Sequence, residues 1–317
     1  MNKLINLALC GAAALAMATS CSSEEDLNVQ NPTDGNVSFT VKLPGSMTTR
    51  AFGDGTEALK FQYAVYQKDG DVYTPMTSQI YANGKDFVNL ESSVDLKLVN
   101  GKTYTIIFWA QSADCNAYTL NWGNRTFSVD YTKMPNNVEA NDAFYAVRTF
   151  KVTGPINETI ELYRPLAQIN LGSNDLQEDA VKTAFGANWN KLNTQMTVSD
   201  VYSTFDFIKG DVVGTPADVT FAIAGIPSGE TFPYEPATYE YINMAYVLTT
   251  QAQSTTVDVK YAVSVGGTEA LNTVSVTQVP IQGNYQTNIF GQILTENAHY
   301  NVIIKPAFKD PDNNQPI

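Results

Sequence analysis

Residues 103–110 have the sequence TYTIIFWA, and this stretch decides the fold. In an extended chain its side chains alternate between two faces. One face carries Tyr104, Ile106, Phe108 and Ala110, and the other carries Thr105, Ile107 and Trp109. Both faces are largely apolar, and aromatic and β-branched residues are typical of strands. We therefore expect a central strand that is covered on both sides.

The same alternation continues on either side of this stretch, and turn signals interrupt it at short intervals. Val37, Phe39, Val41 and Leu43 alternate with polar residues until Pro44-Gly45. Residues 61–66 and 72–73 flank Asp69-Gly70, which predicts a hairpin because glycine tolerates a positive φ. This pattern is the signature of an antiparallel all-β protein.

Three segments depart from simple alternation. Residues 116–141 are irregular and predict a long loop, and residues 159–171 (TIELYRPLAQINL) predict one extended strand. One short helix is expected at residues 175–184, with Asp175 as its cap, Glu178 completing a capping box and Gly186 as its stop. The last strand, at residues 300–308, contains Pro306 and is expected at a sheet edge.

These observations predict an all-β fold with two β-sandwich domains in tandem and one short helix in the second. A chain of this length accommodates two domains of ordinary size. The expected segments are a signal peptide at 1–20, an acidic flexible tether at 21–35, an N-terminal domain at 36–158, a C-terminal domain at 159–308 and a loose tail at 309–317.

The N-terminus has the pattern of a secretory signal. Lys3 precedes a short apolar stretch, and Ala18-Thr19-Ser20 leads into Cys21. The stretch is too short to cross a bilayer as a stable helix. Its end resembles a lipobox, which predicts lipidation of Cys21; an incidental cysteine is the alternative.

Next to Cys21 lies a run of serines and acids that resembles the export tag of Bacteroidetes surface lipoproteins. A solvated acidic linker is the alternative interpretation, and either implies a flexible tether. Together with lipidation, the tag predicts a protein anchored in the outer membrane and displayed on the cell surface. The residues of the predicted tag are Ser22, Ser23, Glu24, Glu25 and Asp26.

Charge and cysteine content exclude several classes of partner and of stabilising bond. The chain carries 32 acidic and 19 basic residues and a formal net charge of −13, so nucleic acids and anionic lipid head groups are poor partners. Of the three cysteines, Cys10 leaves with the signal and Cys21 is lipidated. Cys115 then remains alone, and no intramolecular disulfide is expected.

The sequence offers no recognisable catalytic, metal or cofactor motif. His299 is the one histidine and Cys115 has no basic neighbour in the sequence, so neither is favoured as a catalytic group. A zinc site would need clustered cysteine and histidine. Residues 310–314 are rich in oxygen ligands but lack the glycine and closing glutamate of a calcium loop. We therefore expect a non-enzymatic protein without a metal or cofactor.

Several segments together resemble the fimbrillin-type (FimA/Mfa-like) surface lipoproteins of Bacteroidetes. Beyond the N-terminal signal, they are Thr48-Thr49-Arg50-Ala51, LVNGKTYTIIFWA, LYRPLAQINL and GNYQTNIFGQILT. The resemblance implies two transthyretin-like β-sandwiches and a structural or adhesive pilus subunit at the shaft, tip or anchor. It also implies that other fimbrial subunits are partners by β-strand addition.

The resemblance further implies proteolytic processing between Arg50 and Ala51. The cut would release the first strand and open an apolar groove for a strand of another subunit. The displaced strand would present Val37, Phe39, Val41 and Leu43. An ordinary basic residue in a surface loop is the alternative interpretation of Arg50. The short, proline-bearing tail at 309–317 departs from the family pattern, which leaves the donor role of the last strand, at 300–308, open.

A glycan-binding surface lipoprotein of a nutrient-uptake system is the second hypothesis. Sandwich domains can present aromatic platforms, and tyrosine is abundant in the chain. Trp122, in the irregular segment, is the residue that we expect to contact a sugar under this hypothesis.

Overall fold

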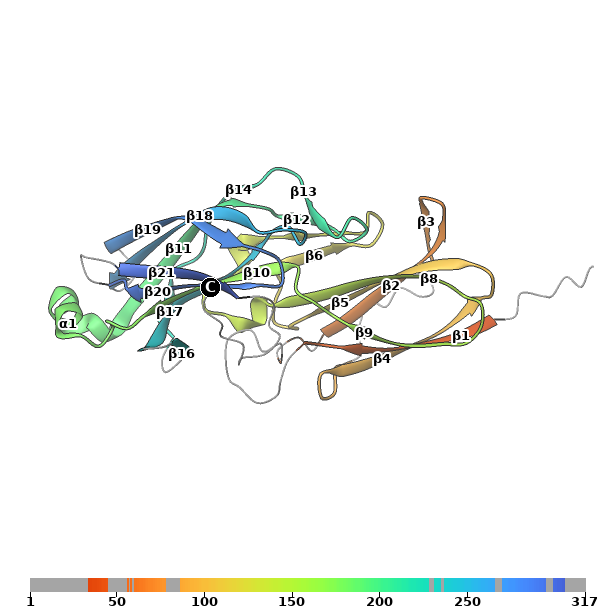
Figure 1. The fold of residues 1–317 in the computed structure, drawn as a ribbon, viewed down its shortest axis with the longest axis horizontal. Helices are drawn as coiled ribbons and strands as arrows, with labels where there is room; N and C mark the ends of the chain where they lie inside the picture. The colour runs from red at the N-terminus through yellow and green to blue at the C-terminus, as the bar shows by residue number, and fades with distance from the viewer. Residues whose placement is uncertain are drawn as a thin grey trace, which may run out of the picture. The chain divides into compact units, whose positions relative to one another are not determined.

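The computed structural model describes residues 34–44, 56, 58, 60–77, 86–227, 231–234, 237–265, 270–294 and 299–305. Met1–Thr33 and Asp34–Ile317 form two separate units, and the description below concerns the second. This part of the chain is built mainly of strands, and its one α-helix is short (Figure 1). The predicted all-β class is therefore confirmed. The predicted signal peptide, tether and tail lie almost entirely outside the described residues.

Two sheets contain most strands of the first half of the chain. Sheet A has the order β4-β1-β9, with β1 at Asp34–Lys42, β4 at Glu91–Val99 and β9 at Ile156–Glu161. Sheet B has the order β3-β2-β5-β8, with β2 at Lys60–Asp69, β3 at Val72–Pro75, β5 at Thr103–Gln111 and β8 at Ala143–Lys151.

Three further sheets complete the described fold. Sheet C has the order β13-β12-β7-β6, with β6 at Tyr118–Asn121, β7 at Thr126–Val129, β12 at Thr204–Asp206 and β13 at Asp211–Val213. Sheet D has the order β16-β17-β10-β20-β21, with β10 at Leu166–Ser173, β16 at Thr231–Tyr234, β17 at Ala237–Leu248, β20 at Gln286–Gln292 and β21 at His299–Lys305. Sheet E has the order β14-β11-β18-β19, with β11 at Leu192–Val201, β14 at Ala217–Thr220, β18 at Thr255–Val265 and β19 at Ala270–Ile281; β15 at Ala224–Gly225 also pairs with β11.

Helical segments are few and short among the described residues. They are α1 at Asp179–Phe185 and the 3₁₀ segments η2 at Tyr131–Lys133, η3 at Glu139–Asn141 and η4 at Gly186–Lys191. None of the described helices is both long and apolar enough to cross a membrane.

The central strand β5 divides its side chains between two hydrophobic cores, as its sequence predicts. Ile106 and Phe108 join the core between sheets A and B, which we call the β1 core. Ile107 and Trp109 join the larger core that extends through sheets C, D and E, which we call the main core. All four side chains are fully buried. Sheet B is therefore covered on both faces, whereas among the described residues sheet A packs on one face only.

The helix is shorter than predicted, and its start is different. α1 begins after Glu178, which makes no side-chain capping hydrogen bond, and it ends as predicted at Gly186, where φ is 63°. Asp175 is not the cap. Its buried carboxylate instead accepts hydrogen bonds from the Ser173 hydroxyl and from the main-chain N–H of Leu294, over 3.1 Å for the latter. The side chain that could cap a helix thus joins the end of β10 to the segment after β20.

The predicted extended strand at residues 159–171 is two strands in two different sheets. β9 ends at Glu161 in sheet A, and β10 begins at Leu166 in sheet D. Arg164 lies between them, fully buried, and its Nε donates to both carboxylate oxygens of Asp142 over 2.7 and 3.0 Å. This buried ion pair and the following Pro165 interrupt the strand pattern.

The predicted long loop at residues 116–141 is more regular than its sequence indicates. It contains the hairpin β6–β7 as well as η2 and η3. β7 pairs with β12 from the second half of the chain, with Phe127 opposite Phe205. Sheet C therefore contains strands from both sides of the predicted domain boundary.

Candidate functional site

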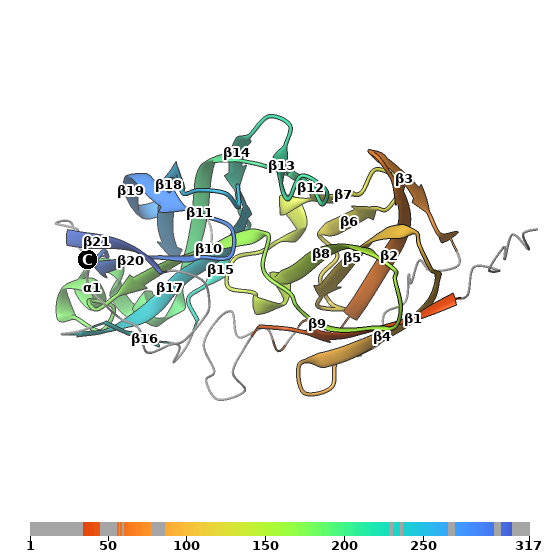
Figure 2. The same ribbon diagram turned by 45° about the vertical axis from the view of Figure 1, so that its right-hand side comes forward.

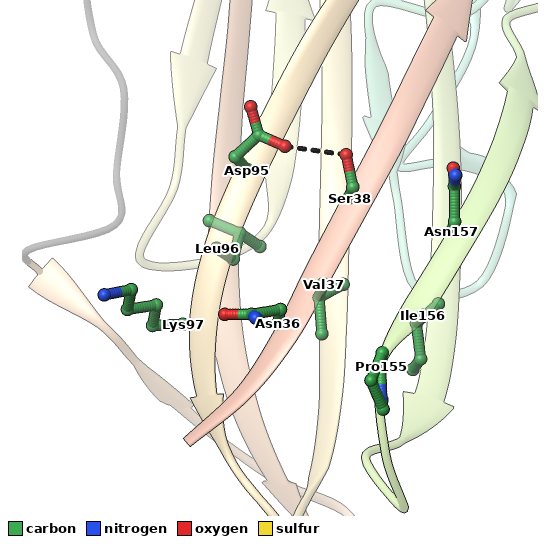
Figure 3. A pocket seen from close by; sticks show the side chains of 9 residues that line it. All are labelled: Asn36, Val37, Ser38, Asp95, Leu96, Lys97, Pro155, Ile156 and Asn157. Atoms are coloured by element: carbon green, nitrogen blue, oxygen red, sulfur yellow. Dashed lines mark hydrogen bonds between the residues drawn. The ribbon is translucent and has the colours of Figure 1, made fainter.

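The predicted displaced strand, β1, lies in the middle of sheet A. It pairs antiparallel with β4, from Asp34 opposite Val99 to Lys42 opposite Glu91. On its other side it pairs parallel with β9, from Val37 opposite Ile156 onward. Figure 3 shows β1 between these two strands. Withdrawal of β1 would therefore leave a strand-wide groove with unpaired backbone groups on both sides.

Side chains of β1 that point inward fill the β1 core. Val37, Phe39 and Val41 are at most 1% exposed, and Leu43, just after the strand, is also buried. The ring of Phe39 meets Phe108 and Phe150 edge to face, with centroids 5.6 and 5.4 Å apart. Such pairs add to the stabilisation from burial alone. The structure thus brings together all four residues of the predicted strand on one buried face.

Burial of these four side chains contributes a large part of the folding free energy of the domain. Each fully buried side chain of this size contributes about 1.5–3 kcal/mol, so the four together contribute on the order of 6–12 kcal/mol. The net stability of a typical domain is only about 5–15 kcal/mol. The β1 core therefore needs either β1 or an equally apolar strand in its place.

The outward side chains of β1 contribute little by comparison. The Ser38 hydroxyl donates to Asp95 Oδ1 over 2.6 Å, and Lys42 Nζ lies 2.6 Å from Glu91 Oε1. Both pairs are exposed to solvent, where such contacts are worth about 0–1 kcal/mol. A shallow hollow of about 360 Å³ lies over sheet A at the N-terminal end of β1. It is lined mainly by outward residues of β1, β4 and the start of β9 (Figure 3).

Gly35 sets a steric limit at the start of the strand. It points inward and is buried, and a Cβ added there would lie 2.4 Å from Val152 Cγ1 and 2.8 Å from Asn100 Oδ1. Contacts this short require the neighbours to move. The groove is therefore wide at Phe39 and closed to side chains at Gly35, and this contrast fixes the register of the strand.

The other residues that the fimbrillin-type resemblance implicates cannot be placed. Cys21, the acidic tag at 22–26, Arg50 and Ala51 all lie outside the described residues. The chain leaves the groove after Leu43, whose N–H donates to the Leu90 carbonyl over 2.9 Å. Processing and lipidation therefore remain predictions.

Two residues considered for chemistry, Cys115 and His299, lie in different parts of the fold. Cys115 is buried, and burial raises the pKa of its thiol. His299 begins β21, opposite Gln292. Within the described residues, no group of three or more histidine, cysteine or acidic side chains could hold a metal ion. The oxygen-rich run at 310–314 lies outside this part of the chain.

Trp122 lies in the turn of the β6–β7 hairpin. Its ring is half-buried and stacks on Phe207, with centroids 6.2 Å apart and planes 13° apart. Its carbonyl accepts a hydrogen bond from the Tyr66 hydroxyl over 2.6 Å. The predicted platform residue is thus held from one side by the main core.

Sequence reasoning missed the parallel neighbour of β1 and the role of Gly35. Nothing in the sequence of β9 indicates that it pairs with a strand about 120 positions earlier. A weak signal for the buried ion pair exists in LYRPLAQINL, because Arg164 is the only charged residue within an otherwise apolar and amide-bearing run. A buried arginine needs a carboxylate partner, which sequence alone could not locate.

Comparison with known proteins places the chain in a family. The sequence profile of a family of unknown function, DUF6562, matches residues 29–316. The chain belongs to this family. No curated protein matches it.

Solved structures similar to this DUF6562 chain include fimbrial and adhesion proteins of Bacteroidetes. They include the tip fimbrial protein Mfa3 of Porphyromonas gingivalis, at 8% identity, with 86% of this chain and 99% of that chain covered and a TM-score of 0.47. A proposed cell adhesion protein of Bacteroides ovatus matches at 11% identity, with 88% and 99% covered and a TM-score of 0.46. A proposed polysaccharide-binding protein of Bacteroides thetaiotaomicron matches at 13% identity, with 87% and 99% covered and a TM-score of 0.45.

Proposed function

We propose that this protein is a structural or adhesive subunit of a cell-surface fibre, without catalytic activity, that assembles by strand exchange. β1 would be a built-in plug that is withdrawn after cleavage at Arg50. The observation that carries the proposal is the position of β1: it is the first described strand, yet it lies in the middle of sheet A.

The contacts that hold β1 support exchange because they are generic. Main-chain hydrogen bonds to β4 and β9 and alternating apolar side chains are interactions that any strand with a similar pattern can reproduce. The outward side chains make only exposed contacts. A strand from another subunit could therefore replace β1, provided that it places no side chain at the position of Gly35.

The energetic cost of an empty groove supports assembly rather than simple loss of the strand. Without β1, the β1 core would lose contributions comparable to the stability of a whole domain. A cleaved subunit would then either keep its own strand or accept one from a neighbour. Acylation at Cys21 and the acidic tag would deliver the closed precursor to the outer membrane surface.

Limited proteolysis tests this proposal directly. Arg50 is the only lysine or arginine between Lys42 and Lys60, so trypsin has a single site in this segment. The chain from Cys21 onward, made with Cys21→Ser to prevent lipidation, is treated with trypsin and examined by mass spectrometry and size-exclusion chromatography. We expect release of residues 21–50 and growth of oligomers, whereas Arg50→Gln should remain uncut and monomeric.

A competing peptide shows whether the groove drives assembly. A synthetic peptide of residues 34–44 should block oligomer growth, and the same peptide with Phe39→Asp should not, because a carboxylate cannot be buried in the β1 core. Strand exchange would be excluded if cleaved protein stayed monomeric at high concentration, or if Arg50→Gln oligomerised equally.

A further inference from the structure

Two hairpins from different sheets meet beside one another, away from the β1 groove. The β2–β3 turn and the β6–β7 turn lie side by side in both ribbon views (Figure 1, Figure 2). The hydrogen bond from Tyr66 to the Trp122 carbonyl joins them. We call the surface residues at this junction the hairpin cluster. Its members are Lys68, Val72, Tyr73, Trp122 and Arg125.

Two cations of the cluster lie on aromatic rings, and the exposed acids Asp69 and Asp71 lie in the same β2–β3 turn. The Arg125 guanidinium carbon is 5.0 Å from the centre of the Tyr73 ring and 5.9 Å from that of Tyr66, and Lys68 Nζ is 5.3 Å from the Tyr73 ring. Among the described residues, no acidic side chain forms an ion pair with either cation. Lys68 Nζ donates to the Gly70 carbonyl, so the Arg125 guanidinium is the cation that is more available to an external anion.

Arg125 contacts both hairpins, and most of its hydrogen-bond donors have no partner among the described residues. Its φ is 57°, a conformation that costs energy for a residue with a side chain, and its carbonyl accepts from the Phe207 N–H over 2.9 Å. Among the described residues its guanidinium donates one hydrogen bond, from Nη1 to the Gly123 carbonyl over 3.2 Å, and its buried Nε has no hydrogen-bond partner. Burial raises the pKa of Tyr66 to about 12, so that ring stays neutral and does not cancel the charge of Arg125.

Apolar and amide side chains lie in the same two hairpins as this guanidinium. Val72 is 64% exposed, and the rings of Tyr73 and Trp122 are half-buried. The side chains of Asn121 and Asn124, in the β6–β7 turn, are exposed. Ring faces can pack against the C–H face of a sugar, amides can bind hydroxyls, and a guanidinium binds a carboxylate through two parallel hydrogen bonds.

We propose that the hairpin cluster binds a saccharide that carries a uronate carboxylate, with Arg125 as the carboxylate ligand and Tyr73 and Trp122 as its apolar platform. This site is separate from the β1 groove and does not depend on strand exchange. It would give the surface protein a defined class of ligand.

The surroundings favour a saccharide over a peptide. β3 has only four residues and ends at Pro75, so it is a poor template for an added peptide strand. The net charge of −13 repels an acidic polymer at long range, but the Debye length is about 8 Å at 0.15 M salt. Under these conditions the nearby charges decide the interaction, namely Lys68 and Arg125 against Asp69 and Asp71, and the uronate must therefore be bound by direct contact with Arg125.

A binding assay at 0.15 M salt tests the site. Immobilised full-length chain with Cys21→Ser is titrated with oligomers of galacturonate, glucuronate and mannuronate, and with a methyl-esterified form of each. We expect at least one uronate to bind and its ester, which lacks the negative charge, to bind roughly tenfold or more weakly. Tyr73→Leu should weaken binding by a similar factor.

Arg125→Gly provides the decisive variant, because glycine relieves the positive φ and the fold should be retained. We expect it to abolish measurable binding, while Lys260→Ala, which removes an exposed cation of β18, should bind as the unmodified chain does. The proposal is overturned if no uronate binds, if the esters bind equally, or if Arg125→Gly retains affinity. Equal competition by polyglutamate would also overturn it, in favour of an acidic polypeptide partner.

Discussion

β1 and β10 occupy equivalent positions in two different sheets, yet they are held in different ways. Each pairs antiparallel with one neighbour and parallel with the other: β1 with β4 and β9, and β10 with β17 and β20. Among the described residues β4 and β9 are the edge strands of sheet A. In sheet D, β16 pairs with the far side of β17 and β21 with the far side of β20. The pairing pattern is thus shared, and the surroundings differ.

The two strands also differ in their side chains. β1 buries one face and leaves the other half-buried or exposed, but every residue of β10 is buried. One end of each β10 amide is paired: Gln168 Oε1 accepts from Gln286 over 2.7 Å, and Asn170 Nδ2 donates to Asn288 over 2.8 Å. Gln168 Nε2 and Asn170 Oδ1 are buried without a hydrogen-bond partner among the described residues. A buried amide pair requires particular partners, because an unpaired amide in the core is costly.

This difference separates a replaceable strand from a fixed one. β1 relies on contacts that many alternating strands could make. β10 relies on hydrogen bonds to particular side chains of its neighbour β20, Gln286 and Asn288. β10 also follows the buried Arg164–Asp142 pair and is followed by Asp175, which is tied to Leu294. The predictions below test this contrast, from the largest expected effect to the smallest.

Removing the ion pair before β10 should have the largest effect. Arg164→Ala leaves the Asp142 carboxylate buried without its partner, and breaking a buried pair in this way costs roughly 3–5 kcal/mol. Arg148→Ala is the matched control, because its pair with Glu158 is largely exposed and should cost at most about 1 kcal/mol. Urea unfolding measures both, and equal losses would contradict the assigned difference in burial.

Shortening an inward side chain of β1 should come next. Val41→Ala removes two methyl groups from the β1 core and should cost about 2–3 kcal/mol, from lost burial and a residual cavity. Thr40→Ala, on the outward face, should change the free energy of unfolding by less than about 0.5 kcal/mol. Chemical denaturation of both variants gives the comparison. Similar costs on the two faces would show that β1 is not held mainly by its inward side.

Adding one carbon at the start of β1 tests the steric limit. Gly35→Ala should destabilise the protein by roughly 1–3 kcal/mol, because its Cβ would collide with Val152. Gly154→Ala is the control: a Cβ there meets nothing within 4 Å, and its φ does not require glycine. Thermal unfolding of the pair should separate them clearly. A neutral Gly35→Ala would remove the register constraint that we assign to the groove.

The smallest effect is expected for the outward polar contact of β1. Ser38→Ala loses an exposed hydrogen bond to Asp95 and should change the unfolding free energy by less than about 0.5 kcal/mol. Asn170→Ala, at the centre of β10, should cost about 1–3 kcal/mol because it leaves the Asn288 amide buried and unpaired. Urea midpoints measured side by side should differ in this order, and the reverse order would contradict the distinction between the two strands.

Local patterns predicted the strands well and their partners poorly. Alternation identified β1 and the two-faced apolar sequence of β5, and Asp69-Gly70 identified the β2–β3 hairpin, whose Gly70 has a φ of 57°. Pairing across long separations left no local trace: β1 lies beside β9, and Asn170 meets a side chain 118 positions later. Asp175 has the sequence of a helix cap, but a long-range hydrogen bond to Leu294 prevailed over the local motif.

The candidate site was predicted only in part. The four inward residues of β1 followed from their spacing, because a period of two places them on one face. Gly35 could not be identified, since its importance depends on Val152, more than a hundred positions away. Arg125 was missed for the same reason: its aromatic neighbours Tyr66 and Tyr73 come from another hairpin.

The parallel pairing of β1 and β9 has a mechanical consequence. The N-terminal end of β1 continues toward the predicted membrane anchor, and the C-terminal end of β9 continues through Arg164 into β10. Tension between the anchor and the second half of the chain would pull these parallel strands in opposite directions along their length. The hydrogen bonds from Val37 to Lys42 would then share the load in shear, instead of opening one at a time like a zipper.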